Sequence, residues 1–197
     1  MAAKPDAPAT RANRDAILVA IRQEFRDCGK VFEIGSGTGQ HAVYFAAAMP
    51  AVTWQTSDRV ENHPGITAWI GEAALDNLLM PVALDVCHDV APDGPFDGVF
   101  SANTAHIMDV EAVDCMFRVA AGALRRGGRF CLYGPFNLDG SFTSASNRRF
   151  DVSLKAQDPA MGIRDLGLLD ELAIRYGMRP LRRYAMPANN MISVWER

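Results

Sequence analysis

Short apolar runs alternate with amphipathic segments along most of the chain. The runs, which are rich in β-branched and aromatic residues, predict strands at 31–34, 52–57, 80–84, 96–101 and 129–133. Apolar residues at helical spacing between these runs predict helices, including those at 64–77 and 110–124. A chain that alternates strand and helix in this way forms a parallel sheet with helices on both faces.

The two ends of the chain extend this pattern. Ile17, Leu18, Ile21 and Phe25 predict a leading helix, capped by Thr10. Residues 1–9 are rich in Ala and Pro and predict a flexible tail, so 10–197 is expected to form one domain. A helix at 168–176 and an antiparallel pair of strands at 181–185 and 191–195 complete the chain. The prediction is an α/β fold, a three-layer α-β-α sandwich around a mostly parallel seven-stranded sheet with an antiparallel terminal hairpin.

Residues 137–167 break the alternation. The segment is polar and contains glycine, although Phe142, Phe150 and Leu154 offer apolar anchors. Long connections inside a compact domain usually carry function. We interpret the segment as a partly ordered lid.

Three glycines follow the first strand and open the next helix. The run Glu33-Ile34-Gly35-Ser36-Gly37-Thr38-Gly39 has the spacing G-x-G-x-G, which predicts a turn whose backbone approaches a ligand closely. A dinucleotide-binding turn has its third glycine three positions after the second, where this chain has Gln40. The spacing therefore disfavours NAD as the ligand.

Polar residues at the ends of later strands point to the same edge of the sheet. Asp58 ends the second strand nineteen positions after Gly39, where a ribose-binding carboxylate is expected. Asn103 and His106 follow the fourth strand and are expected to face the pocket. An imidazole has an ordinary pKa of about 6.5, so His106 is the candidate general base, with a purely structural role as the alternative. His41 is interpreted as a packing residue or as a neighbour of the cofactor.

The glycine run with its leading acid resembles motif I of class I S-adenosylmethionine-dependent methyltransferases. Further segments occur in order along the chain: W-Q-T-S-D, N-x-x-H-I, Y-G-P-F, S-N-x-x-F-D, D-P-x-x-G-I-R-D and M-P-A-N-N. Together they resemble a family of short methyltransferase-like proteins of unassigned activity that includes methyltransferase-like protein twenty-six. The resemblance implies a Rossmann-like class I fold and an S-adenosylmethionine site, but no settled substrate.

Several residue roles are implied by the resemblance. It assigns Asp85 and the backbone of Val86 to the adenine, and Arg14 to the methionine carboxylate of the cofactor. The chain departs from the family pattern after His106-Ile107, where Met108-Asp109 replaces a Pro-Trp pair. The expected cofactor-binding set is Arg14, Glu33, Gly35, Ser36, Gly37, Gly39, Asp58, Asp85, Val86 and Asn103.

The end of the fifth strand, the lid and the terminal hairpin are expected to converge over the cofactor. Their candidate acceptor-binding residues are Tyr133, Asn147, Arg148, Asp151, Arg164, Asn189 and Asn190. The mixture of charges favours a small polar acceptor, although each residue has the alternative role of fixing the lid. The hypothesis is in-line methyl transfer to an oxygen or nitrogen. The alternative is a non-catalytic protein that senses S-adenosylmethionine or its demethylated product, S-adenosylhomocysteine.

Composition limits other classes of function. The net charge of −3 and the absence of an Asn/Asp-Pro-Pro-aromatic signature after the fourth strand disfavour a nucleic-acid substrate, whereas a protein substrate stays open. The four histidines show no HxH or HxxxH spacing, so no metal is expected. Cys28, Cys87, Cys115 and Cys131 are far apart and predict reduced, buried thiols. No long apolar segment is present, and a cytoplasmic location is expected.

Overall fold

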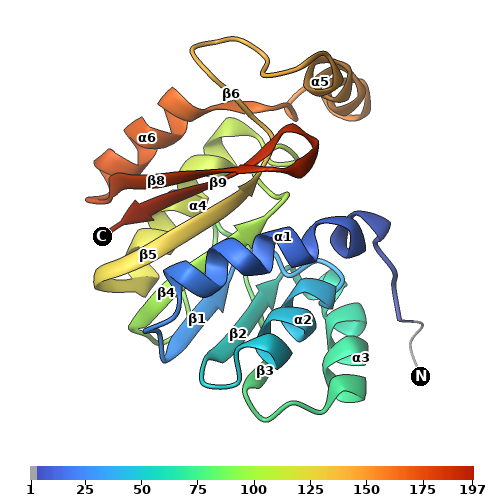
Figure 1. Cartoon of the computed structure of the whole chain (residues 1–197), viewed down its shortest axis with the longest axis vertical. Helices are drawn as coiled ribbons and strands as arrows, with labels where there is room; N and C mark the ends of the chain where they lie inside the picture. The colour runs from blue at the N-terminus through green and yellow to red at the C-terminus, as the bar shows by residue number, and fades with distance from the viewer. Residues whose placement is uncertain (1–3) are drawn as a thin grey trace.

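The computed structural model describes residues 4–197, and its centre is one twisted seven-stranded sheet (Figure 1). The strands lie in the order β3-β2-β1-β4-β5-β9-β8. Strands β1 to β5 run parallel, and β9 and β8 add an antiparallel pair at one edge. The bounds are β1 Lys30–Glu33, β2 Thr53–Asp58, β3 Leu78–Ala83, β4 Phe96–Ala102, β5 Leu124–Gly134, β8 Arg179–Met186 and β9 Asn190–Glu196. The predicted sheet is confirmed.

Helices cover both faces of the sheet, as predicted. One face carries α1 (Pro8–Glu24), α2 (Gln40–Ala48) and α3 (His63–Ala73), and the other carries α4 (Val110–Ala123) and α6 (Leu166–Arg175). Strand neighbours alternate between the two cores, because successive side chains point to opposite faces. In β4, Val99 packs on the α4 side and Phe100 on the α1 side, and both are fully buried. This alternation determines to which face of the sheet the last side chains of each strand point.

The segment that we interpreted as a lid is more regular than its composition suggested. It contains α5 (Ala145–Gln157) and a two-residue parallel pair, β6 (Phe136–Asn137) with β7 (Arg164–Asp165). Ser144 caps α5 by accepting a hydrogen bond from the backbone N–H of Asn147 at 3.1 Å. The helix escaped prediction because its outer face is polar and only a few of its residues are buried.

The N-terminal segment differs from the prediction in two respects. Helix α1 begins at Pro8, and its N-cap residue is Ala7, which has no capping side chain, so the predicted Thr10 cap is wrong. Residues 4–7, which we expected to belong to a flexible tail, contact the domain: the Trp69 indole donates to the Pro5 carbonyl at 2.7 Å. Gln40 Oε1 accepts from the Ala7 N–H at 2.6 Å. The first three residues of that predicted tail lie outside the described residues.

The expectation of four reduced cysteines is corrected at one pair. Cys87, in the loop after β3, and Cys115, in α4, form a disulfide with a Cα–Cα distance of 5.2 Å. Twenty-eight residues separate them in sequence, so no CxxC-like spacing pointed to the pair. Cys28 and Cys131 are free thiols, and only Cys131 is fully buried.

Candidate functional site

The glycine turn lies at the carboxyl end of β1 and is held by the neighbouring strand β2. The backbone N–H groups of Gly35 and Ser36 both donate to the Ser57 carbonyl, at 3.1 and 2.9 Å. Gly35 has φ +73°, and a Cβ there would lie 2.6 Å from Thr104 Cγ2. Gly37 has φ +59°, and a Cβ there would enter open space. The turn therefore presents bare backbone to the cavity beside it.

Glu33 supports this turn from below. Its carboxylate accepts hydrogen bonds from Ser36 Oγ at 2.8 Å and from the Trp54 indole N–H at 3.2 Å, and the residue is 2% exposed. Burial raises the pKa of Glu33 to about 7, and the two donors offset part of that effect. Because Glu33 does not line the cavity, we revise its expected role from cofactor binding to support of the turn.

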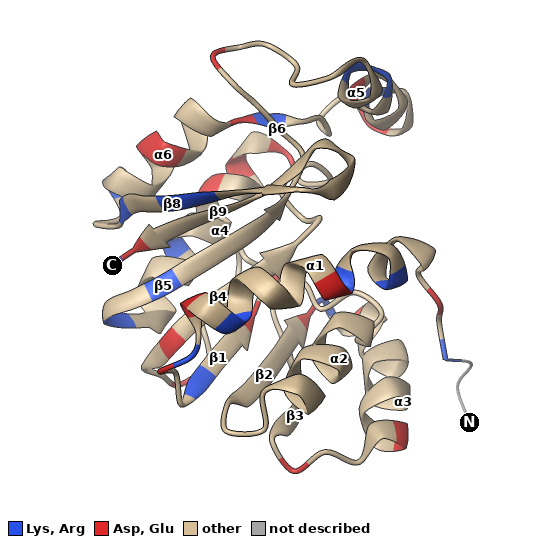
Figure 2. Ribbon diagram, in the orientation of Figure 1, with Lys and Arg blue, Asp and Glu red and all other residues tan. Residues whose placement is uncertain are grey.

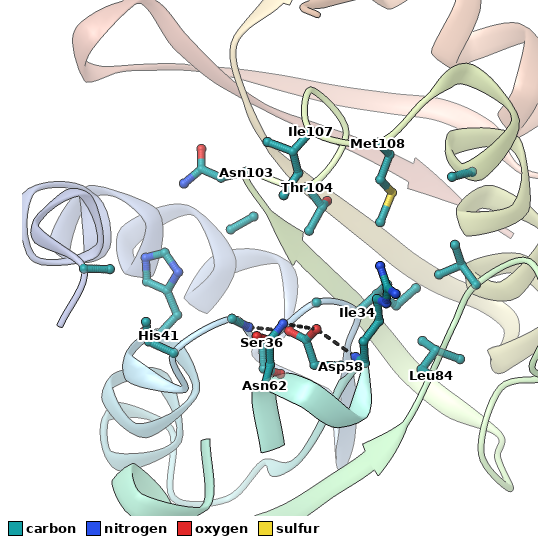
Figure 3. Close-up of a pocket in the computed structure, with 18 of the residues that line it drawn as sticks. Ile34, Ser36, His41, Asp58, Asn62, Leu84, Asn103, Thr104, Ile107 and Met108 are labelled. Carbon is teal, nitrogen blue, oxygen red and sulfur yellow. Dashed lines mark hydrogen bonds between the residues drawn. The ribbon is translucent and has the colours of Figure 1, made fainter. Parts of the chain in front are cut away.

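The Asp58 carboxylate joins the end of β2 to the glycine turn (Figure 3). Oδ2 accepts from the Gly37 N–H at 2.6 Å. Oδ1 accepts from the Arg59 N–H at 2.8 Å and from Asn62 Nδ2 at 2.7 Å. A carboxylate oxygen can accept two hydrogen bonds, so Oδ2 keeps one acceptor position for a ligand. Asn62 also lines the cavity and provides a second polar side chain there.

These residues border a cavity of about 670 Å³, which we call the first chamber. It is lined by the glycine turn, by Asp58 and Asn62, by Leu84, Asp85 and Val86 after β3, and by residues 102–104 at the end of β4. The backbone N–H of Cys87 and the His88 side chain lower the pKa of the Asp85 carboxyl, which keeps it ionised. A volume of this size suits a nucleoside-sized ligand.

Two other residues expected at the cofactor are placed elsewhere. Arg14 lies with its guanidinium 4.4 Å from the Tyr44 ring centroid and does not line the first chamber. Gly39 is the N-cap residue of α2, and a Cβ there would lie 3.0 Å from Ile66 Cα, so its small size serves the packing of α2 against α3. Within residues 4–197 the buried Arg14 Nε has no hydrogen-bond partner, and the expected cofactor roles of Arg14 and Gly39 stay predictions.

A second cavity of about 570 Å³, the second chamber, adjoins the first. Its walls come from α1, the ends of β4 and β5, the N-terminal part of α5, and the turn between β8 and β9, which lie close together in Figure 1. Four of the seven predicted acceptor residues line it: Tyr133, Asn147, Asn189 and Asn190. The chamber therefore brings together residues from five separate segments.

Asn103 lines both chambers. It has φ +61°, a left-handed conformation that asparagine adopts more readily than most residues that carry a Cβ. Its side chain points away from Asp58 and Ser36 in Figure 3. Asn103 thus stands at the passage between the cavities.

His106 lines the second chamber close to this passage. It is 6% exposed, and its ring meets the Phe150 ring edge-to-face at a centroid distance of 5.2 Å. Burial lowers the pKa of His106 to about 4, and Arg164 adds to the effect, so the imidazole is neutral at physiological pH. Within residues 4–197 its ring nitrogens have no hydrogen-bond partner. A neutral imidazole of this kind can accept a proton.

His41 lies in the wall of the first chamber, where its Nε2 is 2.8 Å from Asn13 Oδ1. Its ring stacks on Phe45 at 5.2 Å, in agreement with a packing role. Burial lowers the pKa of His41 to about 4. Asn13 reaches the second chamber as well, so α1 forms part of both walls.

The three charged acceptor candidates do not line the second chamber. Asp151 accepts from the Ile163 N–H at 2.8 Å and from Lys155 Nζ at 2.7 Å. Arg164 donates to the carbonyls of Ala105, Met108 and Ala160. Arg148 is exposed and lies 5.8 Å from the Phe142 ring. The contacts of Asp151 and Arg164 agree with the alternative role of fixing the lid, whereas Arg148 faces outward.

Sequence reasoning missed part of each chamber. Thr104, Ile107, Met108 and Asp158 line the first chamber, and Phe150, Pro135 and Pro187 line the second. The lid reaches the first chamber through Asp158, because Gly162 N–H donates to the His106 carbonyl at 3.0 Å and holds the two loops together. Only the motif D-P-x-x-G-I-R-D marked that contact in the sequence.

Two further observations concern the described part of the chain. No three His, Cys, Asp or Glu side chains gather there as a metal site. Among its helices, none is both long and apolar enough to cross a membrane.

Solved structures with very similar architecture exist. The apo form of the S-adenosylmethionine-dependent methyltransferase SibL superposes with a TM-score of 0.82 at 22% identity, over 96% of this chain and 55% of that one. Human N-acetylserotonin methyltransferase in complex with S-adenosylmethionine gives 0.81 at 13% identity, over 96% and 52%.

A third match, the O-methyltransferase NcsB1 from neocarzinostatin biosynthesis, was solved with S-adenosylmethionine and 2-hydroxy-5-methyl naphthoic acid. It gives a TM-score of 0.79 at 17% identity, over 95% of this chain and 54% of that one. The chain spans about half the length of these three proteins. At these identities the matches show a shared fold, the Rossmann-like class I methyltransferase fold. The sequence itself matches, over residues 4–197, a family described as "Protein of unknown function (DUF938)".

Proposed function

The chain belongs to the DUF938 family, and we propose that it is an S-adenosylmethionine-dependent methyltransferase that acts on a small acceptor through oxygen or nitrogen. The observation that carries the proposal is the pair of chambers that meet at Asn103. A methyl transfer needs a donor and an acceptor held end to end across a short gap, and two adjoining cavities provide that arrangement. We also propose, from the ordered motifs, that the chain is of the methyltransferase-like protein twenty-six type.

The residues of the first chamber fit S-adenosylmethionine. The open space at Gly37 would admit the methionine part against the backbone of the turn, and the free position on Asp58 Oδ2 would accept a ribose hydroxyl. Asp85 and Val86 line the part of the chamber that would hold the adenine, next to the ribose. When bound, S-adenosylmethionine supplies a methyl group on a positively charged sulfur, which keeps the carbon–sulfur bonding pair as the methyl departs.

The residues of the second chamber would hold the acceptor for this transfer. Asn103, at the passage, would bind the attacking hydroxyl or amine and direct its lone pair toward the methyl carbon. His106 would take the proton that this group loses as the new bond forms, since its imidazole is neutral. The imidazolium would then release that proton to solvent. No covalent enzyme intermediate is needed.

Calorimetric titration with S-adenosylmethionine, S-adenosylhomocysteine and NAD tests the proposal. We expect the first two to bind and NAD to bind far more weakly. Asp58→Asn should weaken binding by about tenfold or more, because an amide nitrogen would face the N–H donors that the carboxylate now accepts. Asp76→Asn, the same change at an exposed position, is the matched control.

Two results would contradict parts of the proposal. If the protein binds neither S-adenosylmethionine nor its product, the cofactor assignment fails. If it binds both but no acceptor is methylated in a broad screen, the non-catalytic sensor replaces the enzyme as the better account.

A further inference from the structure

The second chamber has no ionised side chain in its wall. Its lining residues are aromatic, apolar, amide or hydroxyl side chains, together with His106, which is neutral above about pH 5 because its pKa is about 4. The turn at Pro187–Asn189 carries no Lys, Arg, Asp or Glu in Figure 2, although Arg182 and Arg183 lie earlier in β8, at a distance from the turn. This absence contrasts with the many charges on the surrounding lid and α1.

Three charged groups near the chamber are held by other partners, and Arg148, beside Asn147, is exposed and faces away from it. Asp151 is 4% exposed and bonded to Lys155 and to the backbone of Ile163. Arg164 is bonded to three carbonyls, and Arg14 lies over the Tyr44 ring. A rearrangement that brought one of them into the chamber would break these contacts. An ionised ligand would therefore lose hydration in the chamber and find no opposite charge there.

The asparagine side chains in the chamber wall have oxygen atoms that are available to a ligand. Asn147 Nδ2 donates to Thr143 Oγ1 at 2.9 Å and to the Asn189 carbonyl at 3.0 Å. Asn190 Nδ2 donates to the Pro187 carbonyl at 3.2 Å. A carbonyl can only accept, so these bonds fix which end of each amide is nitrogen. The oxygens of Asn147 and Asn190 have no donor within residues 4–197, and neither end of the Asn103 amide has a partner there.

We propose that the second chamber selects an uncharged acceptor with at least two O–H or N–H donors on an apolar, ring-sized body. The left-over amide oxygens would accept from those donors, and Phe150, Pro135 and Pro187 would cover the apolar body. The donor that reaches Asn103 is the one that receives the methyl group. The inference deepens the proposed function and rests on it.

Binding of matched ligand sets, measured by calorimetry on protein saturated with S-adenosylhomocysteine, tests this selection without turnover. One set is catechol, its carboxylate analogue 3,4-dihydroxybenzoate and its ammonium analogue dopamine. A second is resorcinol, its carboxylate analogue 3,5-dihydroxybenzoate and its ammonium analogue 3,5-dihydroxybenzylamine, all of which keep both hydroxyls. In each set that binds, we expect the neutral member to bind about tenfold more tightly or better than both charged members.

Two variants locate the selection in the second chamber. Asn103→Gly keeps the left-handed backbone and removes the amide, so binding of the neutral member, measured at a saturating concentration of S-adenosylhomocysteine, should fall about tenfold. Asn189→Asp adds a carboxylate at the chamber wall and should shift the preference toward the ammonium member. Gln157→Glu makes the same amide-to-carboxylate change at an exposed end of α5, outside the chamber, and should shift nothing.

The proposal is overturned if a charged member binds the wild type as tightly as its neutral analogue, or if no neutral member of either set binds. It is also overturned if Asn189→Asp and Gln157→Glu have the same effect. Failure of S-adenosylhomocysteine to saturate the protein would instead contradict the proposed function, so the two failures are distinguishable.

Discussion

The two chambers share one edge of the sheet but are built in different ways. The first depends on a continuous stretch, Glu33–Gly39, together with single residues at the ends of the next strands. The second is assembled from five segments that include the first helix, the lid and the terminal hairpin. A local motif fixes the shape of the first chamber, whereas long-range packing fixes the second. We therefore expect the two chambers to respond differently to substitution.

The charges of the two chambers differ as well. The first chamber has ionisable groups in its wall, Asp58 and Asp85, whose carboxylates accept backbone hydrogen bonds. The second chamber excludes such groups and uses the nearby charges to hold its walls. Charge close to a candidate site is therefore not evidence of charge within the site.

The largest effect is expected at His106, in the second chamber. His106→Gln should lower turnover of an accepted substrate by about 10²–10⁴-fold if the imidazole is the general base. Affinity for S-adenosylmethionine, measured by calorimetry, should stay unchanged because His106 does not line the first chamber. The wild-type rate should fall only below about pH 5, since the pKa of His106 is about 4. A small loss of turnover with an unchanged pH profile would indicate a shaping role.

The next largest effect is expected at Arg164, which fixes the lid to the loop after β4. Arg164→Ala removes hydrogen bonds to three carbonyls, and we expect a loss of about 3 kcal/mol in the free energy of unfolding by urea. Arg175→Ala, which removes a surface ion pair between α6 and Asp114 on α4, is the control and should cost well under about 1 kcal/mol. An Arg164 variant as stable as the control would contradict the structural role.

The first chamber was more predictable than the second for a physical reason. The backbone conformations at Gly35 and Gly37 require particular residue types at fixed spacing, so the sequence marks them directly. Asp58 was marked by its place at a strand end. Asn147 and Arg148 are neighbouring polar residues that both looked able to bind an acceptor, and the register of α5 decides which one is buried. The spacing of the cysteines in the sequence also did not indicate the Cys87–Cys115 disulfide.

The dependence of stability on pH should have opposite signs at His106, in the second chamber, and at Glu33, beneath the glycine turn. His106 has a lowered pKa, so its stabilising contribution is present above pH 6.5 and is lost as the pH falls toward 4. Glu33 has a raised pKa, so its contribution is present below pH 4.5 and is lost as the pH rises toward 7. Between pH 7 and 5, each change amounts to about 2 kcal/mol.

Isosteric variants separate these two contributions in urea unfolding at pH 5 and 7. His106→Gln should make the protein less sensitive to acid, and Glu33→Gln should make it more sensitive, each relative to the wild type. His41 also has a lowered pKa and remains in both variants, so it does not affect the difference between them. Shifts of the same sign in both variants would contradict the assignment of protonation states in the two regions.

The smallest effect is expected at Arg148, and it gives a sensitive test of the uncharged second chamber. Arg148→Ala should change the free energy of unfolding by less than about 0.5 kcal/mol, because the side chain is exposed and makes only a distant contact with Phe142. Asn147→Ala, one position earlier, removes two hydrogen bonds from a buried amide and should cost about 2 kcal/mol. Ligand titrations should show the same order, with neutral probes weakened only by Asn147→Ala. If Arg148→Ala weakened the anionic probes selectively, the guanidinium would have to reach the chamber in solution, and the contrast in charge between the two chambers would be lost.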